Sequence, residues 1–238
     1  YAFISHTYGI HMTEKCVYLQ AKCKRLLESL EGRMRFLTLH RTRLGRTLSS
    51  APRAVLPIEK LAFRVGVVLR AWPHPESEKL WCQEIDVGDD DDGDLTTLAT
   101  RTIASGIRAH YAEPSDLEGR RVVVATNLKP RKIAGFVSQG MVLCASKAVD
   151  GRDSVELVEV PVGADIGERI TFPEFSFSDD ATFAPALKLS GNQSNKLWKA
   201  VATKLTTNDA GVACYDGSPF TTSAGLCTAA TLTDALVT

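Results

Sequence analysis

One short segment of the sequence concentrates side chains that can bind a polyanion. Three cations and four polar or soft side chains lie within it: Asn127, Lys129, Arg131, Lys132, Ser138, Gln139 and Met141. Lys and Arg neutralise phosphates and release counterions, whereas amides and hydroxyls hydrogen-bond sugars, phosphates or base edges. A methionine beside such donors can pack on an exposed base or ribose. The pattern favours a phosphate-binding loop, and the alternative is a solvated turn between two strands.

Motifs for catalysis or metal binding do not appear in the sequence. The chain has no phosphate-loop, nucleophile-elbow, dinucleotide or zinc-hydrolase motif, and its six cysteines form no Cys-x-x-Cys pair. Cys82, Cys144 and Cys214 lie in apolar strand-like runs that are typical of buried thiols. Residues 89–94 are almost entirely Asp, but a calcium loop needs a distal Glu, so we predict a solvated loop. We therefore predict no catalytic residue, no metal site and no cofactor.

The charges are distributed unevenly along the 238 residues. Lys plus Arg and Asp plus Glu number 28 each, which gives a formal net charge of zero, but residues 1–60 hold 11 basic and 4 acidic side chains. A basic leader of +7 is thus balanced by an acidic remainder. Because a cationic segment attracts polyanions even in a neutral molecule, the zero total does not exclude a nucleic-acid partner.

The basic leader contains two predicted segments. Apolar residues at alternating spacings of three and four predict a helix over about residues 13–31, which should dock on its own domain or on a partner helix. Residues 33–53 are rich in Arg and lack acidic side chains, which is typical of an organelle transit peptide and also of a flexible RNA-binding arm. Both interpretations stay open, and with them a cytoplasmic or a mitochondrial or plastid location.

Beyond residue 60 the periodicity becomes that of strands. One face of the first strand would carry Phe63, Val65, Val67 and Leu69, and the other Arg64, Gly66, Val68 and Arg70. This period of two predicts that the first face is buried, and the Pro-rich residues 72–75 should end the strand. Further strands are predicted at residues 80–87, 102–107, 121–126, 141–144 and 155–160. So many short strands predict a fold dominated by β structure and built on a small, closed or nearly closed barrel.

The binding segment also resembles a known signature. Residues 127–146, NLKPRKIAGFVSQGMVLCAS, are similar to the tRNA-binding domain shared by the endothelial monocyte-activating polypeptide II group and by appended domains of some methionyl- and tyrosyl-tRNA synthetases. Supporting segments occur in the family's order: FRVGVV, HPESEKLWCQEIDVG and RTIASGI before the signature, and VGADIGERITF after it. The similarity covers residues 61–172. It continues in KLWKAV, LTTNDAGVACYDGSPF and GLCTAATL, which look like the carboxy-terminal module of that polypeptide group.

The resemblance implies a fold and a division of the chain. We expect an oligonucleotide-binding (OB) fold, a five-stranded barrel, over residues 61–172. A basic appendage over residues 1–60 would contain the amino-terminal helix, and a small β-rich extension over residues 173–238 would pack on the barrel. In the extended subgroup this module occupies the place of a second barrel, which implies a monomeric pseudo-dimer.

The resemblance also implies a function without catalysis. The barrel would recognise the elbow of tRNA by shape and backbone and would assist aminoacylation as a cofactor of aminoacyl-tRNA synthetases. Lys79, Ser138 and Met141 match family residues associated with tRNA contact, and four further residues belong to the matching loop: Asn127, Lys129, Lys132 and Gln139. Arg131 is a basic replacement at a variable position. The alternative is a scaffold of a multi-synthetase complex, tethered by the amino-terminal helix, in which RNA binding is secondary.

Two further features complete the expectations. Residues 89–100 have no counterpart in the family and form an acidic insertion, which we expect to point away from RNA because it would repel phosphate. Residues 64–68 match a segment linked to a cytokine activity of the family, but the same residues also form an ordinary alternating strand. No membrane-spanning segment is predicted, since no apolar stretch is long enough.

Overall fold

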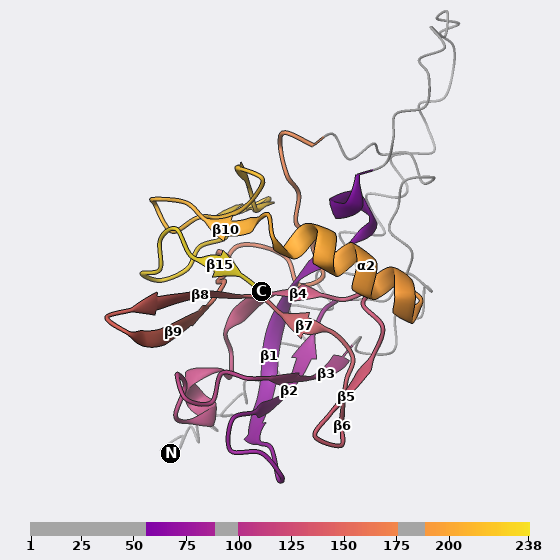
Figure 1. Cartoon of the computed structure of the whole chain (residues 1–238), viewed down its shortest axis with the longest axis vertical. Helices are drawn as coiled ribbons and strands as arrows, with labels where there is room; N and C mark the ends of the chain where they lie inside the picture. Colours follow the sequence, from indigo (N-terminus) through magenta and orange to yellow (C-terminus); the bar gives the residue numbers. More distant parts are fainter. Residues whose placement is uncertain (1–55, 89–99, 176–188) are drawn as a thin grey trace, which may run out of the picture. The chain divides into compact units, whose positions relative to one another are not determined.

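The computed structural model describes residues 56–88, 100–175 and 189–238 (Figure 1). The predicted helix at residues 13–31, the Arg-rich segment at residues 33–53 and residues 89–99 of the insertion lie outside these ranges. The longest helix in the described part is α2 (Gly191–Ala202), with twelve residues. None of the helices in these ranges combines the length and the apolarity needed to cross a bilayer.

An antiparallel sheet forms the barrel. Its strand order is β3-β2-β1-β4-β7, built from β1 (Phe63–Pro73), β2 (Trp81–Asp86), β3 (Thr100–Ser105), β4 (Arg121–Ala125) and β7 (Met141–Val142). Leu143 extends the ladder, because its N–H donates to the Val123 carbonyl at 2.9 Å and its carbonyl accepts from the Val158 N–H at 3.0 Å. The predicted nearly closed, five-stranded β barrel is confirmed.

Shorter elements flank the barrel. Two hairpins accompany the barrel strands: β5 (Arg131–Ile133) with β6 (Phe136–Ser138), between β4 and β7, and β8 (Cys144–Val149) with β9 (Arg152–Leu157), after β7. Short 3-10 turns occur at η1 (Pro57–Lys60) and η2 (Pro114–Asp116). After α2 come β10 (Leu205–Thr207), β11 (Ala213–Tyr215), β12 (Ser218–Pro219), β13 (Thr221–Thr222), β14 (Gly225–Leu226) and β15 (Leu236–Val237). Because β15 pairs with β8, strands β10, β11, β12 and β15 share a sheet with the β8–β9 hairpin, whereas β13 and β14 pair with each other.

Two hydrophobic cores lie on opposite faces of the central strands. The inner core fills the barrel and includes Val68, Ile85, Ile103, Leu117, Val122, Val124 and Leu157. The outer core joins the other strand faces to η1, α2 and the carboxy-terminal strands, and includes Ile58, Phe63, Val65, Val123, Ala125, Phe172, Val201, Leu205 and Phe220. Neighbouring residues of β4 therefore belong to different cores, which explains why this strand is an unbroken apolar run.

The structure corrects the predicted burial of β1. Phe63 and Val65 are buried as expected, but Val67 is half-buried and Leu69 is exposed, whereas Val68 is buried. One reason is that both faces of this strand meet a core. The other is a bulge between Val68 and Arg70, which interrupts the pairing with β2. The strand ends at Pro73, within the Pro-rich residues 72–75 that were predicted to end it, and its last residues still pair with β2.

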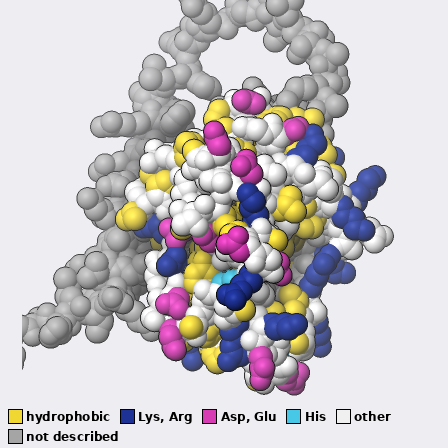
Figure 2. Space-filling view, turned by 60° about the vertical axis from the view of Figure 1, so that its left-hand side comes forward, with side chains coloured by type: hydrophobic (Ala, Val, Ile, Leu, Met, Phe, Trp, Pro, Cys, Tyr) yellow, Lys and Arg dark blue, Asp and Glu magenta, His cyan; other side chains and the backbone are white. Residues whose placement is uncertain are grey.

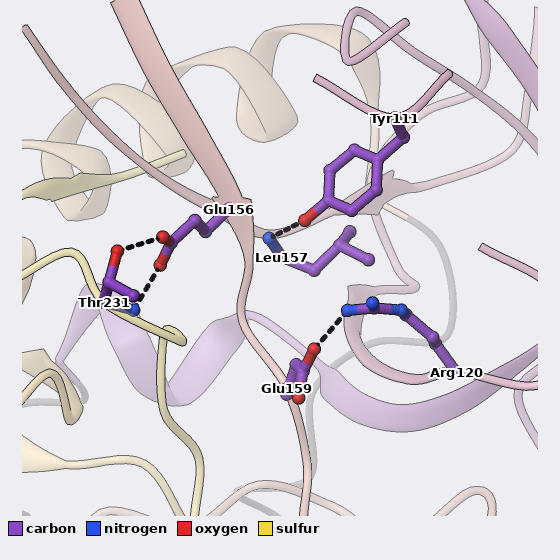
Figure 3. Close-up of polar contacts among 6 residues, drawn as sticks. All are labelled: Tyr111, Arg120, Glu156, Leu157, Glu159 and Thr231. Atoms are coloured by element: carbon purple, nitrogen blue, oxygen red, sulfur yellow. Dashed lines mark hydrogen bonds and ion pairs between the residues drawn. The ribbon is translucent and has the colours of Figure 1, made fainter. Parts of the chain in front are cut away.

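Polar contacts fasten the carboxy-terminal strands to β9 (Figure 3). The Glu156 carboxylate accepts hydrogen bonds from the Thr231 hydroxyl, from the Thr231 N–H at 2.7 Å and from the Leu232 N–H at 3.0 Å. Burial raises the pKa of Glu156, but these hydrogen bonds outweigh it and leave the pKa below its ordinary value. On the neighbouring residue, the Leu157 N–H donates to the Tyr111 hydroxyl at 2.9 Å.

Candidate nucleic-acid interface

The β5–β6 hairpin presents the densest group of predicted binding residues. Its two turn residues, Ala134 and Gly135, both have positive φ, at 46° and 85°. This is the backbone of a two-residue type I′ turn, whose twist matches that of the flanking strands, and Gly135 adopts it without strain. The turn therefore holds Arg131 and Lys132 on a short, regular hairpin, where both side chains are exposed.

Ser138 and Gln139 attach this hairpin to β3. The Ser138 hydroxyl, 4% exposed, accepts from the Ala104 N–H at 3.2 Å and donates to the Gly140 carbonyl at 3.0 Å. The Gln139 side-chain oxygen accepts from the Thr102 N–H at 2.9 Å and from its hydroxyl at 3.0 Å. We therefore assign both side chains to positioning the hairpin, and neither has its main hydrogen-bonding atom turned to solvent.

Asn127 and Met141 also have structural surroundings. Asn127 is 1% exposed; its side-chain oxygen accepts from the Ala62 N–H at 2.9 Å and its amide donates to the Lys60 carbonyl at 2.9 Å. These bonds hold the start of the binding loop against the chain that enters β1. Met141 pairs with Ala125 in the sheet and is half-buried against the outer core. Like Ser138 and Gln139, these two residues hold the loop by contacts with the rest of the fold.

The four predicted cations have the opposite environment. The side chains of Lys79, Lys129, Arg131 and Lys132 are all exposed. Lys129 and Arg131 reach α2: the Lys129 backbone N–H donates to the Ser194 hydroxyl at 3.2 Å, and the Arg131 guanidinium hydrogen-bonds the Asn195 side-chain oxygen. The structure thus separates the predicted site into buried residues that hold the loop and exposed cations that can meet phosphate.

An aromatic group connects the hairpin to the segment that carries Lys79. The Phe136 ring packs edge-on against Trp72 and His74, with centroid distances of 6.2 and 6.1 Å, and the Arg70 guanidinium lies 5.3 Å from the Trp72 ring centre. Half-buried aromatic and guanidinium planes are surfaces on which bases stack. The sequence pattern does not predict this group, because the Pro-rich residues 72–75 indicate only a strand break. The sequence signal that was available is the aromatic residue Trp72 near the end of a predicted strand.

A pocket of about 480 Å³ lies next to the aromatic group. Its walls are Pro73, His74, Pro75, Glu76, Ser77, Glu78 and Arg108. The carboxylates of Glu76 and Glu78 and the guanidinium of Arg108 line the pocket, so its net negative charge disfavours phosphate binding. The Glu76 wall of the pocket lies close to the tip of the hairpin, because a Cβ added to Gly135 would come within 3.7 Å of the Glu76 carboxylate.

The four cysteines in the described part of the chain offer no reactive thiolate on this surface. Burial raises the pKa of Cys144 and of Cys227 to about 12, and it also raises the pKa of Cys82 and Cys214. Within residues 56–88, 100–175 and 189–238, no group of three or more His, Cys, Asp or Glu could hold a metal ion. The chemistry that the described residues offer here is charge pairing and stacking.

Charged side chains are unevenly distributed over one face of the described molecule. Figure 2 shows Lys and Arg side chains concentrated along the right-hand edge of the described molecule, with Asp and Glu mostly elsewhere on that face. Such segregation of charge concentrates a polyanion on one side of a molecule whose total charge is zero.

Comparisons with known proteins match the same part of the chain. The family model tRNA_bind, which describes a tRNA binding domain, matches residues 63–169. The cytoplasmic methionine--tRNA ligase of Arabidopsis thaliana is 38% identical over 76% of this chain, which corresponds to 20% of the ligase. The tRNA-aminoacylation cofactor arc1 of Schizosaccharomyces pombe is 32% identical over 66% of this chain and 32% of the cofactor. The chain thus spans a fifth to a third of these relatives.

A solved structure supports the fold. The carboxy-terminal domain of Plasmodium vivax p43 superposes with a TM-score of 0.63 at 29% identity, and the match covers 76% of this chain and 98% of that domain. The match extends beyond the barrel, since the barrel segment at residues 63–169 accounts for less of the chain than this. The signature at residues 127–146 lies within the matched segment, and residues 63–169 of this chain match the tRNA-binding domain family.

Proposed function

We propose that this protein binds tRNA without catalysing a reaction and supports aminoacylation as a cofactor or complex component of aminoacyl-tRNA synthetases. The observation that carries the proposal is the exposed trio Lys129, Arg131 and Lys132 on a loop that buried hydrogen bonds hold in place. Cations on a fixed frame bind phosphates with little loss of conformational entropy on binding.

The same geometry favours recognition of backbone and shape over sequence. Base edges are usually read by amide side chains or by a bidentate Arg. Asn127 uses its side-chain amide to bond Ala62 and Lys60, and the Gln139 side-chain oxygen is engaged by Thr102. Phosphate contacts fix register and orientation but carry no sequence information. We therefore infer that many tRNAs bind with similar affinity, through features that all tRNAs share.

The relatives support the role in aminoacylation. One carries the matching segment within a methionine--tRNA ligase, and another is named a tRNA-aminoacylation cofactor. We propose that the present chain likewise brings tRNA to a synthetase partner. Holding tRNA beside the enzyme would raise its effective concentration there. The location we propose is cytoplasmic, like that in the name of the plant ligase, with an organellar location as the alternative if residues 33–53 are a transit peptide.

We propose three parts for the chain: a basic appendage over residues 1–60, the barrel over residues 61–172, and an extension over residues 173–238 that covers the outer faces of β1 and β4. Val65, Val123 and Ala125 would be solvent-exposed without that cover. Because the extension already occupies this apolar face of the barrel, the face is not available to a second copy, and we propose a monomer.

The test compares tRNA binding by the full chain and by a triple variant, Lys129→Ala, Arg131→Ala and Lys132→Ala. Filter binding with several unrelated tRNAs should show a large loss of affinity that is similar for all of them. A synthetase charging assay at limiting tRNA should lose its stimulation by the chain in parallel. Undiminished binding by the triple variant would overturn the proposal, and loss confined to one tRNA would overturn the inference that recognition is by shape.

A further inference from the structure

Two segments that lack acidic residues meet at the binding loop. Residues 119–149 contain no Asp or Glu, and neither do residues 181–208, which include α2. Such gaps are long for a chain in which Asp and Glu number 28 of 238 residues. The first segment carries Lys129, Arg131 and Lys132, and the second carries Lys196 and Lys199 on α2. Both α2 lysines are exposed.

Specific contacts fix α2 against the loop. Ser194 is buried and its hydroxyl accepts from the Lys129 N–H, while Asn195 bonds the Arg131 guanidinium. The Lys129 side chain runs across Gly191, where an added Cβ would lie 3.1 Å from the Lys129 Cδ atom. The same side of α2 packs into the outer core through Val201, which follows Ser194 by seven residues, with Trp198 half-buried between them. The remaining side of the helix faces solvent.

The spacing along α2 continues the line of cations. Asn195 and Lys199 are separated by four residues, so they lie on one face of the helix about 6 Å apart along its axis. Lys196 is adjacent to Asn195 and exposed. Since Asn195 contacts Arg131, the two lysines lie directly beyond the point where the loop touches the helix. No acidic side chain occurs in α2 to neutralise them.

We propose that α2 is the second half of the RNA-binding surface, and that Lys196 and Lys199 bind phosphates of the same tRNA molecule that the β5–β6 hairpin binds. This inference rests on the proposed function. The carboxy-terminal extension then has two tasks: its buried residues cover the barrel, and its exposed helix face lengthens the phosphate-binding surface. The partner is recognised by its chemistry, a folded RNA whose phosphates span both elements.

The experiment uses the full chain and an unmodified tRNA transcript. Each phosphate contact contributes about 0.9 to the slope of log affinity against log salt. Over the tenfold range from 1 M to 0.1 M salt, this slope corresponds to a roughly eightfold gain in affinity for each contact. The double variant Lys196→Ala and Lys199→Ala should therefore lose about tenfold or more at 0.1 M salt, with the slope reduced by about 1.8. Retention of charge in Lys196→Arg and Lys199→Arg should restore most of the affinity.

The matched control removes two cations elsewhere. Lys147 and Arg152 are exposed on the β8–β9 hairpin, which lies on the opposite side of the view from α2 and the β5–β6 hairpin (Figure 1). Lys147→Ala with Arg152→Ala changes the net charge equally and should leave the salt slope within about 0.3 of wild type. Circular dichroism should show α2 intact in every variant, since Ala is the strongest helix former.

Three outcomes would be decisive. One outcome is wild-type affinity and slope in the α2 double variant, together with a loss in the triple variant that replaces Lys129, Arg131 and Lys132. It would overturn this inference and leave the proposed function standing. An equal loss in the Lys147 and Arg152 control would also overturn it, because net charge alone would then account for binding. Wild-type binding by the hairpin triple variant would instead overturn the proposed function.

Discussion

Ser138 provides a sharp test of whether the signature residues contact RNA or hold the loop. Its hydroxyl accepts from the Ala104 N–H and donates to the Gly140 carbonyl. Ser138→Ala removes both hydrogen bonds and leaves the buried Ala104 N–H without its acceptor. A buried donor that loses its partner costs about 1–3 kcal/mol. We expect the free energy of unfolding to fall by that amount.

The assay is thermal melting together with tRNA binding. For a folded unit of this size, each kcal/mol lowers Tm by about 2–4 °C, so Ser138→Ala should melt about 2–12 °C below wild type. The variant keeps every cation, so the salt slope of tRNA binding should not change, and affinity at 25 °C should fall less than about threefold. Lys132→Ala should do the reverse, with an unchanged Tm and a slope smaller by about 0.9.

Two results would refute the reasoning about Ser138. If Ser138→Ala kept the wild-type Tm and lost most of its affinity, the hydroxyl would be an RNA contact and not part of the frame. Ser154 on β9 is half-buried and serves as the comparison. If Ser154→Ala lowered Tm as much as Ser138→Ala, loss of a serine hydroxyl alone would explain the effect, and the two hydrogen bonds of Ser138 would not be its cause.

Three further predictions concern the fold. The lowered pKa of Glu156 means that its carboxylate stabilises the fold at pH values above its ordinary pKa of 4.5, and that this contribution disappears as pH falls through the folded-state pKa; urea unfolding from pH 7 to pH 3 should show a steeper loss for wild type than for Glu156→Gln. Gly88→Ala should lower the free energy of unfolding by about 3 kcal/mol or more, since φ is 81° and the added Cβ would lie 2.4 Å from the Gly167 Cα atom. Gly119 has a similar φ of 82° but open space around it, so Gly119→Ala should cost only about 1–2 kcal/mol in the same denaturant measurement. Cys144 and Cys227, with pKa values of about 12, should resist alkylation at pH 8 in the native state and react in urea, as mass spectrometric mapping would show; rapid native labelling would contradict their burial.

Much of the barrel could be predicted because its strands are short, apolar and separated by turn residues. β2 and β4 lie within a residue of the predicted ranges, at Trp81–Asp86 and Arg121–Ala125. The predicted strand at residues 141–144 is instead two strands that meet at Leu143, where the chain leaves one sheet for the other. A local pattern does not reveal such a change of sheet.

Burial on β1 could not be predicted, because it depends on residues more than a hundred positions away. An alternating pattern predicts one buried face, but Phe63 packs against Phe172 and Phe220 on the face opposite the inner core. Only the position of the carboxy-terminal strands determines that this second face is covered. The pattern therefore cannot distinguish a strand with one core from a strand between two.

The structure brings most of the predicted binding residues together in one loop, whereas the sequence did not distinguish their separate environments. Asn, Ser and Gln can either bind RNA or hold a loop, and residue type does not decide between these roles. Asn127 holds its loop because Lys60 and Ala62 happen to present a carbonyl and an N–H to it. Lys196 and Lys199 were missed for the complementary reason, since their distance in sequence from Arg131 conceals that α2 lies beside the hairpin.

The central claim is that the exposed cations of the loop bind tRNA phosphates. The most direct measurement is the affinity for one tRNA from 50 to 400 mM salt, compared between the wild-type chain and the variant Lys129→Ala, Arg131→Ala, Lys132→Ala. Because the variant lacks three cations that pair with phosphates, its slope of log affinity against log salt should be smaller by about 2.7, while Tm stays at the wild-type value. Equal slopes and equal affinities for the two proteins, with both folded, would contradict the account.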